Sequence, residues 1–238
     1  MDRNIYRDWV KSEDLVRTVV SCLETDICIM GDRDLKAEAL ESVYKYRKEI
    51  EDYIKIDPAF RDSLEPIEAN GDPSPIIKSM ISAGKAAGVG PFAAVAGAVA
   101  EHVGRDLLAY SKEIIVENGG DIFIKSQKDR RFGIFAGESP LTGALGFEIM
   151  AQDTPLGVCT SSGTVGHSLS FGKADAVCII AKDTATADAT ATAACNMVKS
   201  GDDIERSISF ARSVKGVISV IVIVKDKFGT WGNIKLGA

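Results

Sequence analysis

The chain has 238 residues, of which 45% are hydrophobic and 26% are charged, so it can bury a full core as one domain or as one domain with a small appendage. The formal net charge of −6 argues against nucleic acid as the main partner, because phosphate neutralisation requires a basic face. Five cysteines without a CxxC pair and only two histidines favour a reducing cytoplasm and argue against a histidine-rich metal site.

Neither a targeting segment nor a membrane span is predicted. Residues 1–15 carry charges throughout and contain no apolar core of the kind found in signal peptides. The longest strongly apolar run, Val217–Val224, is far shorter than the roughly 20 residues that a helix needs to cross a bilayer. We therefore expect a cytoplasmic protein that has no membrane partner.

The first third of the chain predicts two short strands and a long helix. β-Branched residues mark the strands, and apolar residues at three- and four-residue steps mark the helix. These elements are expected at Val16–Cys22, Thr25–Met30 and Leu35–Ile56. Asp32 or Asp34 is expected to cap the helix.

Two further helices are predicted around a glycine- and proline-containing break. The first spans Pro75–Ala87 and ends near Gly88. The second, Pro91–Ala109, begins with a proline at the tolerated first turn. Its alanine and glycine face favours close packing against the sheet. A phosphate at Gly88-Val89-Gly90 and a contact between subunits of a homo-oligomer are the alternatives.

Strands dominate the remainder of the chain, with one pair of helices among them. Strands are expected at Ile114–Val116, Ile122–Ile124, Phe132–Phe135, Ala144–Ile149, Ala174–Ala181 and Val217–Val224, with Phe228–Leu236 completing a last hairpin. Helices are expected at Thr184–Lys199 and at Asp202–Ser213, the second capped by Asp202. Strands in runs and helices in pairs indicate an α+β fold, an antiparallel sheet packed with helices. One domain of residues 1–238 is expected, in which residues 1–64 form an N-terminal hairpin plus the long helix.

The helix expected at Thr184–Lys199 carries a candidate metal site. Asp188 and Thr192 are four residues apart and share a face. A carboxylate and a hydroxyl, completed by a backbone carbonyl, are oxygen ligands of the kind that Mg²⁺ prefers. Alternatively, Asp188 only interacts favourably with the dipole of the first helical turns.

Two polar segments are candidate ligand-binding turns. Asn118-Gly119-Gly120-Asp121 admits positive φ at both glycines, and its aspartate can accept from a ligand amine or ribose. An ordinary hairpin turn is the alternative. Thr160-Ser161-Ser162-Gly163 offers hydroxyls and amides that can surround a phosphate. His167, a candidate catalytic residue with Asp188, either orients a ligand or bonds a loop carbonyl. Cys159 has no partner base except His167, which argues against a thiol nucleophile.

Together, the order GGD, TSSG and ADATAT resembles the ApbE superfamily of Mg²⁺-dependent flavin transferases, whose fold is T-fold-like. Longer stretches, VGPFAAVAGAVAE, VENGGDIFI, TSSGTVGHSLSFGKADA and ADATATAACN, are similar to an uncharacterised prokaryotic branch related to ApbE. The resemblance implies a nucleotide at Gly119, Gly120 and Asp121. It also implies a flavin site lined by Thr160, Ser161 and Gly163. It further implies Mg²⁺ on Asp188 and Thr192.

Two features of ApbE enzymes are absent. Their Lys-Gly pair before GGD is replaced by Gly90-Pro91, and their His-Ile-x-Asp-Pro stretch is replaced by His167-Ser168 in a shorter connection. Three functions therefore stay open. The first is an Mg²⁺-dependent enzyme that transfers FMN from FAD to a protein hydroxyl or hydrolyses FAD. The second is a flavin- or nucleotide-binding module without turnover. The third is a structural or assembly protein, such as a homodimer.

Overall fold

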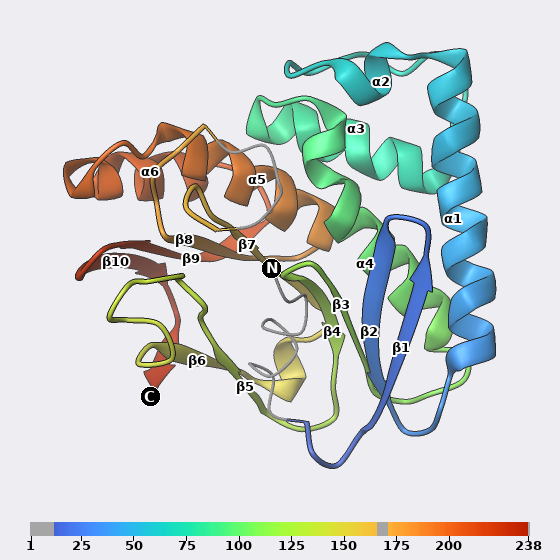
Figure 1. Ribbon diagram of the computed structural model, residues 1–238, viewed down its shortest axis with the longest axis horizontal. Helices are drawn as coiled ribbons and strands as arrows, with labels where there is room; N and C mark the ends of the chain where they lie inside the picture. The colour runs from blue at the N-terminus through green and yellow to red at the C-terminus, as the bar shows by residue number, and fades with distance from the viewer. Residues whose placement is uncertain (1–11, 166–170, 238) are drawn as a thin grey trace.

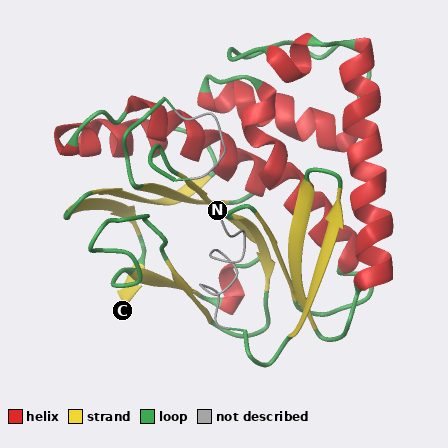
Figure 2. Cartoon of the chain, in the orientation of Figure 1, coloured by secondary structure: helices red, strands yellow, loops and turns green. Residues whose placement is uncertain are grey.

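An eight-stranded antiparallel sheet organises the chain in the computed structural model, which describes residues 12–165 and 171–237 (Figures 1 and 2). Its strands, in spatial order, are β1 (Val16–Cys22), β2 (Thr25–Gly31), β3 (Ile114–Asn118), β4 (Asp121–Lys125), β7 (Leu156–Ser161), β8 (Ala176–Ala181), β9 (Val217–Val224) and β10 (Lys227–Gly232). A smaller sheet contains β11 (Lys235–Gly237), β6 (Gly146–Ile149) and β5 (Arg130–Gly133). The predicted α+β class with an antiparallel sheet is confirmed.

Helices cover one face of the large sheet, and the small sheet lies against the other (Figure 1). The helices are α1 (Lys36–Ile56), α2 (Ala59–Asp62), α3 (Pro75–Ala87), α4 (Val95–Leu107), α5 (Thr184–Met197) and α6 (Ile204–Ala211), with short 3₁₀ turns η2 (Pro91–Ala94), η3 (Ala151–Asp153) and η4 (Gly201–Asp203). Side chains alternate between the two faces along each strand. On β4, Phe123 therefore packs against the helices, whereas Ile122 and Ile124 face the small sheet.

The helix with the small-residue face is buried inside the chain, as predicted for packing against the sheet. A Cβ placed on Gly104 would lie 2.2 Å from Cδ1 of Phe123 on β4, so only glycine permits this approach. Ala98 and Ala100 are fully buried. This face is therefore covered by the chain's own sheet and by α5, and it leaves no such surface for a subunit contact. The glycines at 88 and 90 serve the chain path, because Gly88 ends α3 in the left-handed region with φ +70° and the Gly90 N–H donates to the Leu64 carbonyl.

The predicted helix caps have different outcomes. Residue 35 is the N-cap of α1, but the Asp34 carboxylate accepts the N–H of Lys36, the first residue of the helix, at 3.0 Å, as well as the Thr18 hydroxyl. The Asp32 carboxylate instead accepts the Lys112 N–H. Near the second site, Ser200 and Asp203 form the reciprocal capping box around η4, so Asp202 is not the cap. Short polar side chains compete for nearby backbone groups, and the sequence does not show which one succeeds.

Several elements differ from the predictions, among them β7, which was not expected. Helix α2 was not expected, and the helix predicted from Pro91 divides into η2 and α4. The predicted final hairpin ends early, because only β10 pairs with β9, whereas β11 turns away and pairs with β6. No single helix among the described residues is long and apolar enough to cross a membrane; α3 with residues 91–107 meets the length and composition test only as a pair bent by 107°.

Candidate functional site

The Gly-Gly turn between β3 and β4 is anchored to helix α4. Gly119 and Gly120 have φ of +66° and +103°, in the region that favours glycine. The Asn118 side-chain amide donates to the Ala96 carbonyl at 3.0 Å, and the Gly120 N–H donates to the Glu117 carboxylate at 2.9 Å. Side chains of the hairpin itself therefore fix the predicted turn, and one of its two glycine amides is already bonded.

The second polar segment lies directly beside this turn, but half of it is strand. Strand β7 continues through Ser161, and Cys159 is the register partner of Asp121 on β4. Thr160 and Ser161 are thus strand residues, and the predicted turn begins only at Ser162. Pairing with β8, beyond the point where the pairing with β4 stops at Cys159, extends the strand through these hydroxyl residues, and β-branched threonine suits such pairing.

The loop after β7 is organised by Ser162 and Gly163. The Ser162 Oγ accepts the N–H groups of residues 164 and 165 at 3.1 and 3.0 Å. The Gly163 N–H donates to the Ala174 carbonyl at 2.9 Å, and a Cβ on Gly163 would lie 2.2 Å from the Gly172 carbonyl oxygen. The glycine is therefore required by close backbone contact, and the serine oxygen bonds within its own loop.

Asp188 lies in the interior, at the contact between α5 and α4. Its carboxylate accepts the backbone N–H of Gly97 at 2.9 Å, and the residue is 8% exposed. A Cβ on Gly97 would lie 2.5 Å from the Thr184 carbonyl oxygen and 2.8 Å from Cβ of Asp188. Gly97 on α4 and the alanine-rich surface of α5 together allow the α4 backbone to come within hydrogen-bond distance of the buried Asp188 carboxylate.

Asp121 faces the same buried region from the sheet and is 9% exposed. Burial raises the pKa of Asp121 well above its usual value, and the neighbouring charge of Asp188 raises it further. Burial likewise raises the pKa of Asp188, against the lowering effect of the Gly97 N–H. The nearby Cys159 side chain and the Thr160 N–H only partly offset the cost at Asp121. Two adjacent carboxylates therefore share a site in which full ionisation is unfavourable.

No lysine or arginine of residues 12–165 and 171–237 forms an ion pair with either aspartate. Buried carboxylates are normally paired, protonated or bound to a cation. The raised pKa values favour protonation of this pair when no cation is bound, and a divalent cation would balance its charge once both carboxyl groups are ionised.

The donor set fits Mg²⁺, which binds through one or two protein carboxylates and keeps several water molecules or phosphate oxygens. Asp121 and Asp188 supply the carboxylates. The hydroxyl of Thr184, one turn before Asp188, is buried without a hydrogen-bond partner. The described residues contain no group of three or more His, Cys, Asp or Glu side chains arranged for a metal, so a transition-metal cage is not what this site offers.

The other predicted residues have different outcomes. Thr192 lies half-buried one turn beyond Asp188 on α5. His167 lies outside the described residues. Cys159 is fully buried, its thiol donates to the Thr184 carbonyl at 3.4 Å, and burial raises its pKa well above the usual value, all of which disfavours nucleophilic chemistry.

Sequence reasoning missed two residues that build the site. The Glu101 carboxylate on α4 accepts the Thr184 N–H at the start of α5 at 2.6 Å, and Arg105 also donates to it. Gly97 supplies the amide that faces Asp188. The sequence does indicate close packing at Gly97, since it is a glycine within an alanine-rich helix. It does not show which element packs there, because residue spacing within one helix carries no information about its neighbour.

Comparison with known proteins shows what the chain resembles. A family model described as "AbpE bacteria" matches residues 7–217. A UPF0280 protein of Methanocaldococcus jannaschii is 41% identical over 231 residues, which covers 95% of this chain and 92% of that protein. A UPF0280 protein of Methanocella arvoryzae is 40% identical over 212 residues, covering 89% of this chain and 86% of that protein.

Solved structures share the fold at low sequence identity. The flavin transferase ApbE from Vibrio cholerae, in a mutant form, superposes with a TM-score of 0.59 at 14% identity, covering 91% of this chain and 96% of that one. The ApbE protein from Thermotoga maritima gives a TM-score of 0.56 at 14% identity, covering 90% and 96%. At such identity the likeness establishes the ApbE-like fold alone.

Proposed function

This chain belongs to the AbpE bacteria family and to the UPF0280 proteins, and on that premise we propose that it is an Mg²⁺-dependent enzyme acting on the pyrophosphate bond of a flavin or another nucleotide. The reaction is FMN transfer from FAD to a protein hydroxyl, or hydrolysis of FAD to FMN and AMP. The ApbE-like fold, shared with proteins that include a flavin transferase, supports this class of substrate.

The observation that carries the proposal is the buried pair Asp121 and Asp188 at the junction of the two polar segments. The pair has neighbouring carboxylates and no basic partner among the described residues. Structural aspartates gain little from such an arrangement, because unpaired buried charge is costly. Binding of a cation with its phosphate ligand would offset this cost, which explains why two buried aspartates lie together here.

Each residue has a defined task in this proposal. Asp188, fixed by the Gly97 N–H, and Thr192 would hold the metal, with Asp121 facing it from the sheet. The bound Mg²⁺ would neutralise charge on the phosphoryl oxygens as the bond to phosphorus breaks. The ends of β4 and β7 position the substrate phosphates beside Thr160, Ser161 and the Gly119-Gly120 turn. Burial between α4, α5 and the sheet keeps bulk water from the aspartates.

A binding module without turnover is the second candidate. It is favoured by the internal bonding of the polar turns, since the Gly120 amide and the Ser162 oxygen are already engaged within the chain. The position of the family's Lys-Gly pair is also taken by Gly90, which is buried and bonded to the Leu64 carbonyl. Few amide and hydroxyl groups of these turns are then free to stabilise a reacting phosphate, and binding a ligand requires fewer of them than catalysis does.

The experiment that separates them incubates the protein with FAD and Mg²⁺ and measures AMP release and flavinylation of acceptor proteins. The enzyme predicts AMP that depends on Mg²⁺, falls to background in Asp188→Asn, and is unchanged in Asp202→Asn, whose aspartate is exposed. Absence of AMP and of flavinylated acceptor contradicts the enzyme. An FAD-dependent rise in melting temperature that persists in Asp188→Asn without product would then support the binding module.

A further inference from the structure

The chain contains two Asn-Gly pairs, Asn70-Gly71 and Asn118-Gly119. In such a pair the backbone nitrogen of the glycine can attack the side-chain Cγ of the asparagine, which is one reason why asparagine is a thermolabile residue. Glycine favours the attack because it has no Cβ to keep its nitrogen away from the asparagine side chain. The attack also requires a side chain that is free to turn toward the next peptide group, so the surroundings of each pair decide whether it reacts.

The first pair is exposed and open. Asn70 lies in the loop between α2 and α3 (Figure 1), and it is exposed together with Gly71 and Asp72. Its side-chain amide has no hydrogen-bond partner among the described residues. Gly71 has φ of +72°, and a Cβ added to it would meet no atom within 4 Å. The Asn70 side chain and the Gly71 nitrogen are therefore free to approach each other without unfolding of the protein.

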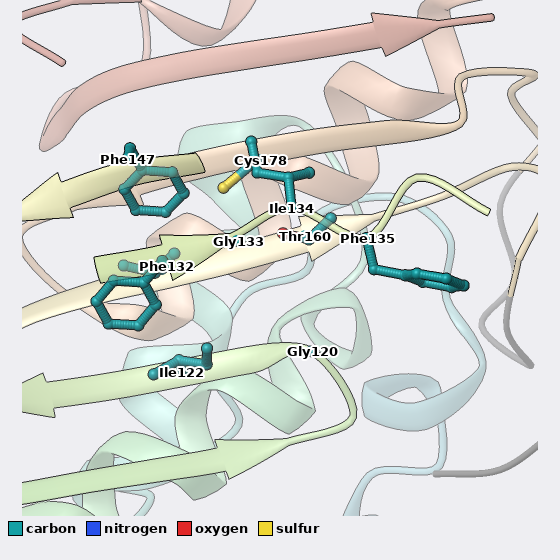
Figure 3. A pocket seen from close by; sticks show the side chains of 10 residues that line it. Gly120, Ile122, Phe132, Gly133, Ile134, Phe135, Phe147, Thr160 and Cys178 are labelled. Atoms are coloured by element: carbon teal, nitrogen blue, oxygen red, sulfur yellow. The ribbon is translucent and has the colours of Figure 1, made fainter. Parts of the chain in front are cut away.

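The second pair is held in place by helix α4. It begins the turn that contains Gly120 and joins β3 to β4 (Figure 3). Asn118 is half-buried, and its side-chain amide donates to the Ala96 carbonyl at 3.0 Å. Its backbone is fixed by pairing with Asp121 across the hairpin. The Asn118 side chain must break its bond to α4 before its Cγ can meet the Gly119 nitrogen, so the fold opposes the reaction at this residue of the candidate site.

We propose that Asn70 is a site of spontaneous deamidation, whereas Asn118 is protected by its bond to α4 although it has the same Asn-Gly sequence. The Gly71 nitrogen forms a bond to Cγ of Asn70 as the bond from Cγ to Nδ2 breaks. Ammonia leaves with the proton that the Gly71 nitrogen loses. Water then opens the cyclic imide at either of its carbonyl groups and gives aspartate or isoaspartate. Water is the only co-reactant, so the reaction is independent of the proposed enzyme activity.

Both products change the loop. Each adds a negative charge between Glu68 and Asp72, and isoaspartate also adds a methylene group to the backbone after residue 70. The Asn70 N–H donates to the Tyr53 hydroxyl at 2.8 Å, and Tyr53 is a buried residue of α1. Isoaspartate should therefore disturb the contact that attaches this loop to the long helix.

The test compares three asparagines in one protein by peptide mass spectrometry after incubation at pH 9. Asn70 and Asn118 differ in their surroundings, whereas Asn233 is exposed like Asn70 but precedes Ile234, whose branched side chain shields the attacking nitrogen. The same incubation in guanidinium chloride removes the contact of Asn118 with α4. Asn70→Gln is the matched variant, because glutamine would have to form a larger and less favourable ring.

In the folded protein, Asn70 should be modified at least about tenfold faster than Asn118 or Asn233, which corresponds to a barrier lower by about 1.4 kcal/mol. In guanidinium chloride, Asn118 should approach the rate of Asn70, and Asn233 should stay slow. The more acidic form that accumulates on ion-exchange chromatography should be absent from Asn70→Gln.

The inference is overturned if Asn70 stays unmodified in the folded protein, or if Asn118 reacts as fast as Asn70 while folded. An acidic form that persists in Asn70→Gln places the reaction elsewhere and overturns it as well. If Asn118 stays slow in guanidinium chloride, the contact with α4 is not the cause of its protection, and that part of the inference is wrong.

Discussion

Replacing Asp188 with asparagine should stabilise the metal-free protein at alkaline pH. Burial raises the pKa of Asp188 from 3.8 to about 7, and each unit corresponds to about 1.4 kcal/mol. Ionising this side chain in the folded state therefore costs on the order of 4 kcal/mol. Asparagine has similar volume and carries no charge, so Asp188→Asn avoids this cost while its side-chain oxygen can still accept the Gly97 N–H.

The sign of the pH dependence follows from proton counting. Between pH about 4 and about 7 the folded state holds the Asp188 proton that the unfolded state has lost, so stability falls as pH rises through this window. Below pH 4 both states are protonated, and the two proteins should have similar stability. At pH 8 in EDTA, Asp188→Asn should melt roughly 10 °C higher than the unmodified protein, by the usual relation for a chain of this size.

Thermal unfolding at pH 5 and pH 8, with EDTA or with Mg²⁺, measures this effect. Mg²⁺ should raise the melting temperature of the unmodified protein at pH 8 much more than at pH 5, because the cation competes with protons for the carboxylates. It should have little effect on Asp188→Asn. The exposed Asp202→Asn is the control. A melting temperature for Asp188→Asn that stays below that of the unmodified protein at pH 8 in EDTA would refute the reasoning.

Three further substitutions test the surroundings of the site. Gly97→Ala should destabilise the protein by about 1–3 kcal/mol in urea unfolding, since its Cβ would lie 2.5 Å from the Thr184 carbonyl oxygen; an unchanged urea midpoint contradicts this close packing. Arg130→Met should cost about 3–5 kcal/mol in the same assay, because it leaves the buried Glu113 carboxylate without its 2.9 Å partner, and restoring stability with the additional change Glu113→Gln would confirm the cause. Ser200→Ala removes the capping box before α6 and should cost about 1 kcal/mol, with Ser213→Ala as a control outside the cap.

The sequence predicted the elements whose signals are local. Helix α3 has the predicted bounds, because Pro75 begins it and Gly88 ends it with a left-handed residue. The run of β-branched residues at Val217–Val224 likewise forms β9 as expected. Strand β7 was not recognised, since its Thr-Ser end has the composition of a turn and becomes a strand only through pairing with β8.

The candidate site was predictable in its parts and not in its geometry. Spacing identified Asp188 on a helix and a turn before Asp121, but spacing does not show that both side chains point into one buried region. That depends on Gly97, which brings α4 against α5, and on the register that places Asp121 opposite Cys159. Long-range packing of this kind has no signature in a single short segment. The metal-binding and catalytic assignments of these residues stay predictions.

The pairing of β11 with β6 has a consequence for the order in which the protein assembles during synthesis. Strands β5 and β6 leave the ribosome before β7, β8, β9 and β10, yet the small sheet gains its third strand only after residues 235–237 have emerged. By then every strand of the large sheet has already been translated. Contacts between residues so distant along the chain form slowly. The small sheet, which carries Phe132 on β5 and Phe147 on β6, should therefore be among the last parts of a nascent molecule to acquire protection from hydrogen exchange.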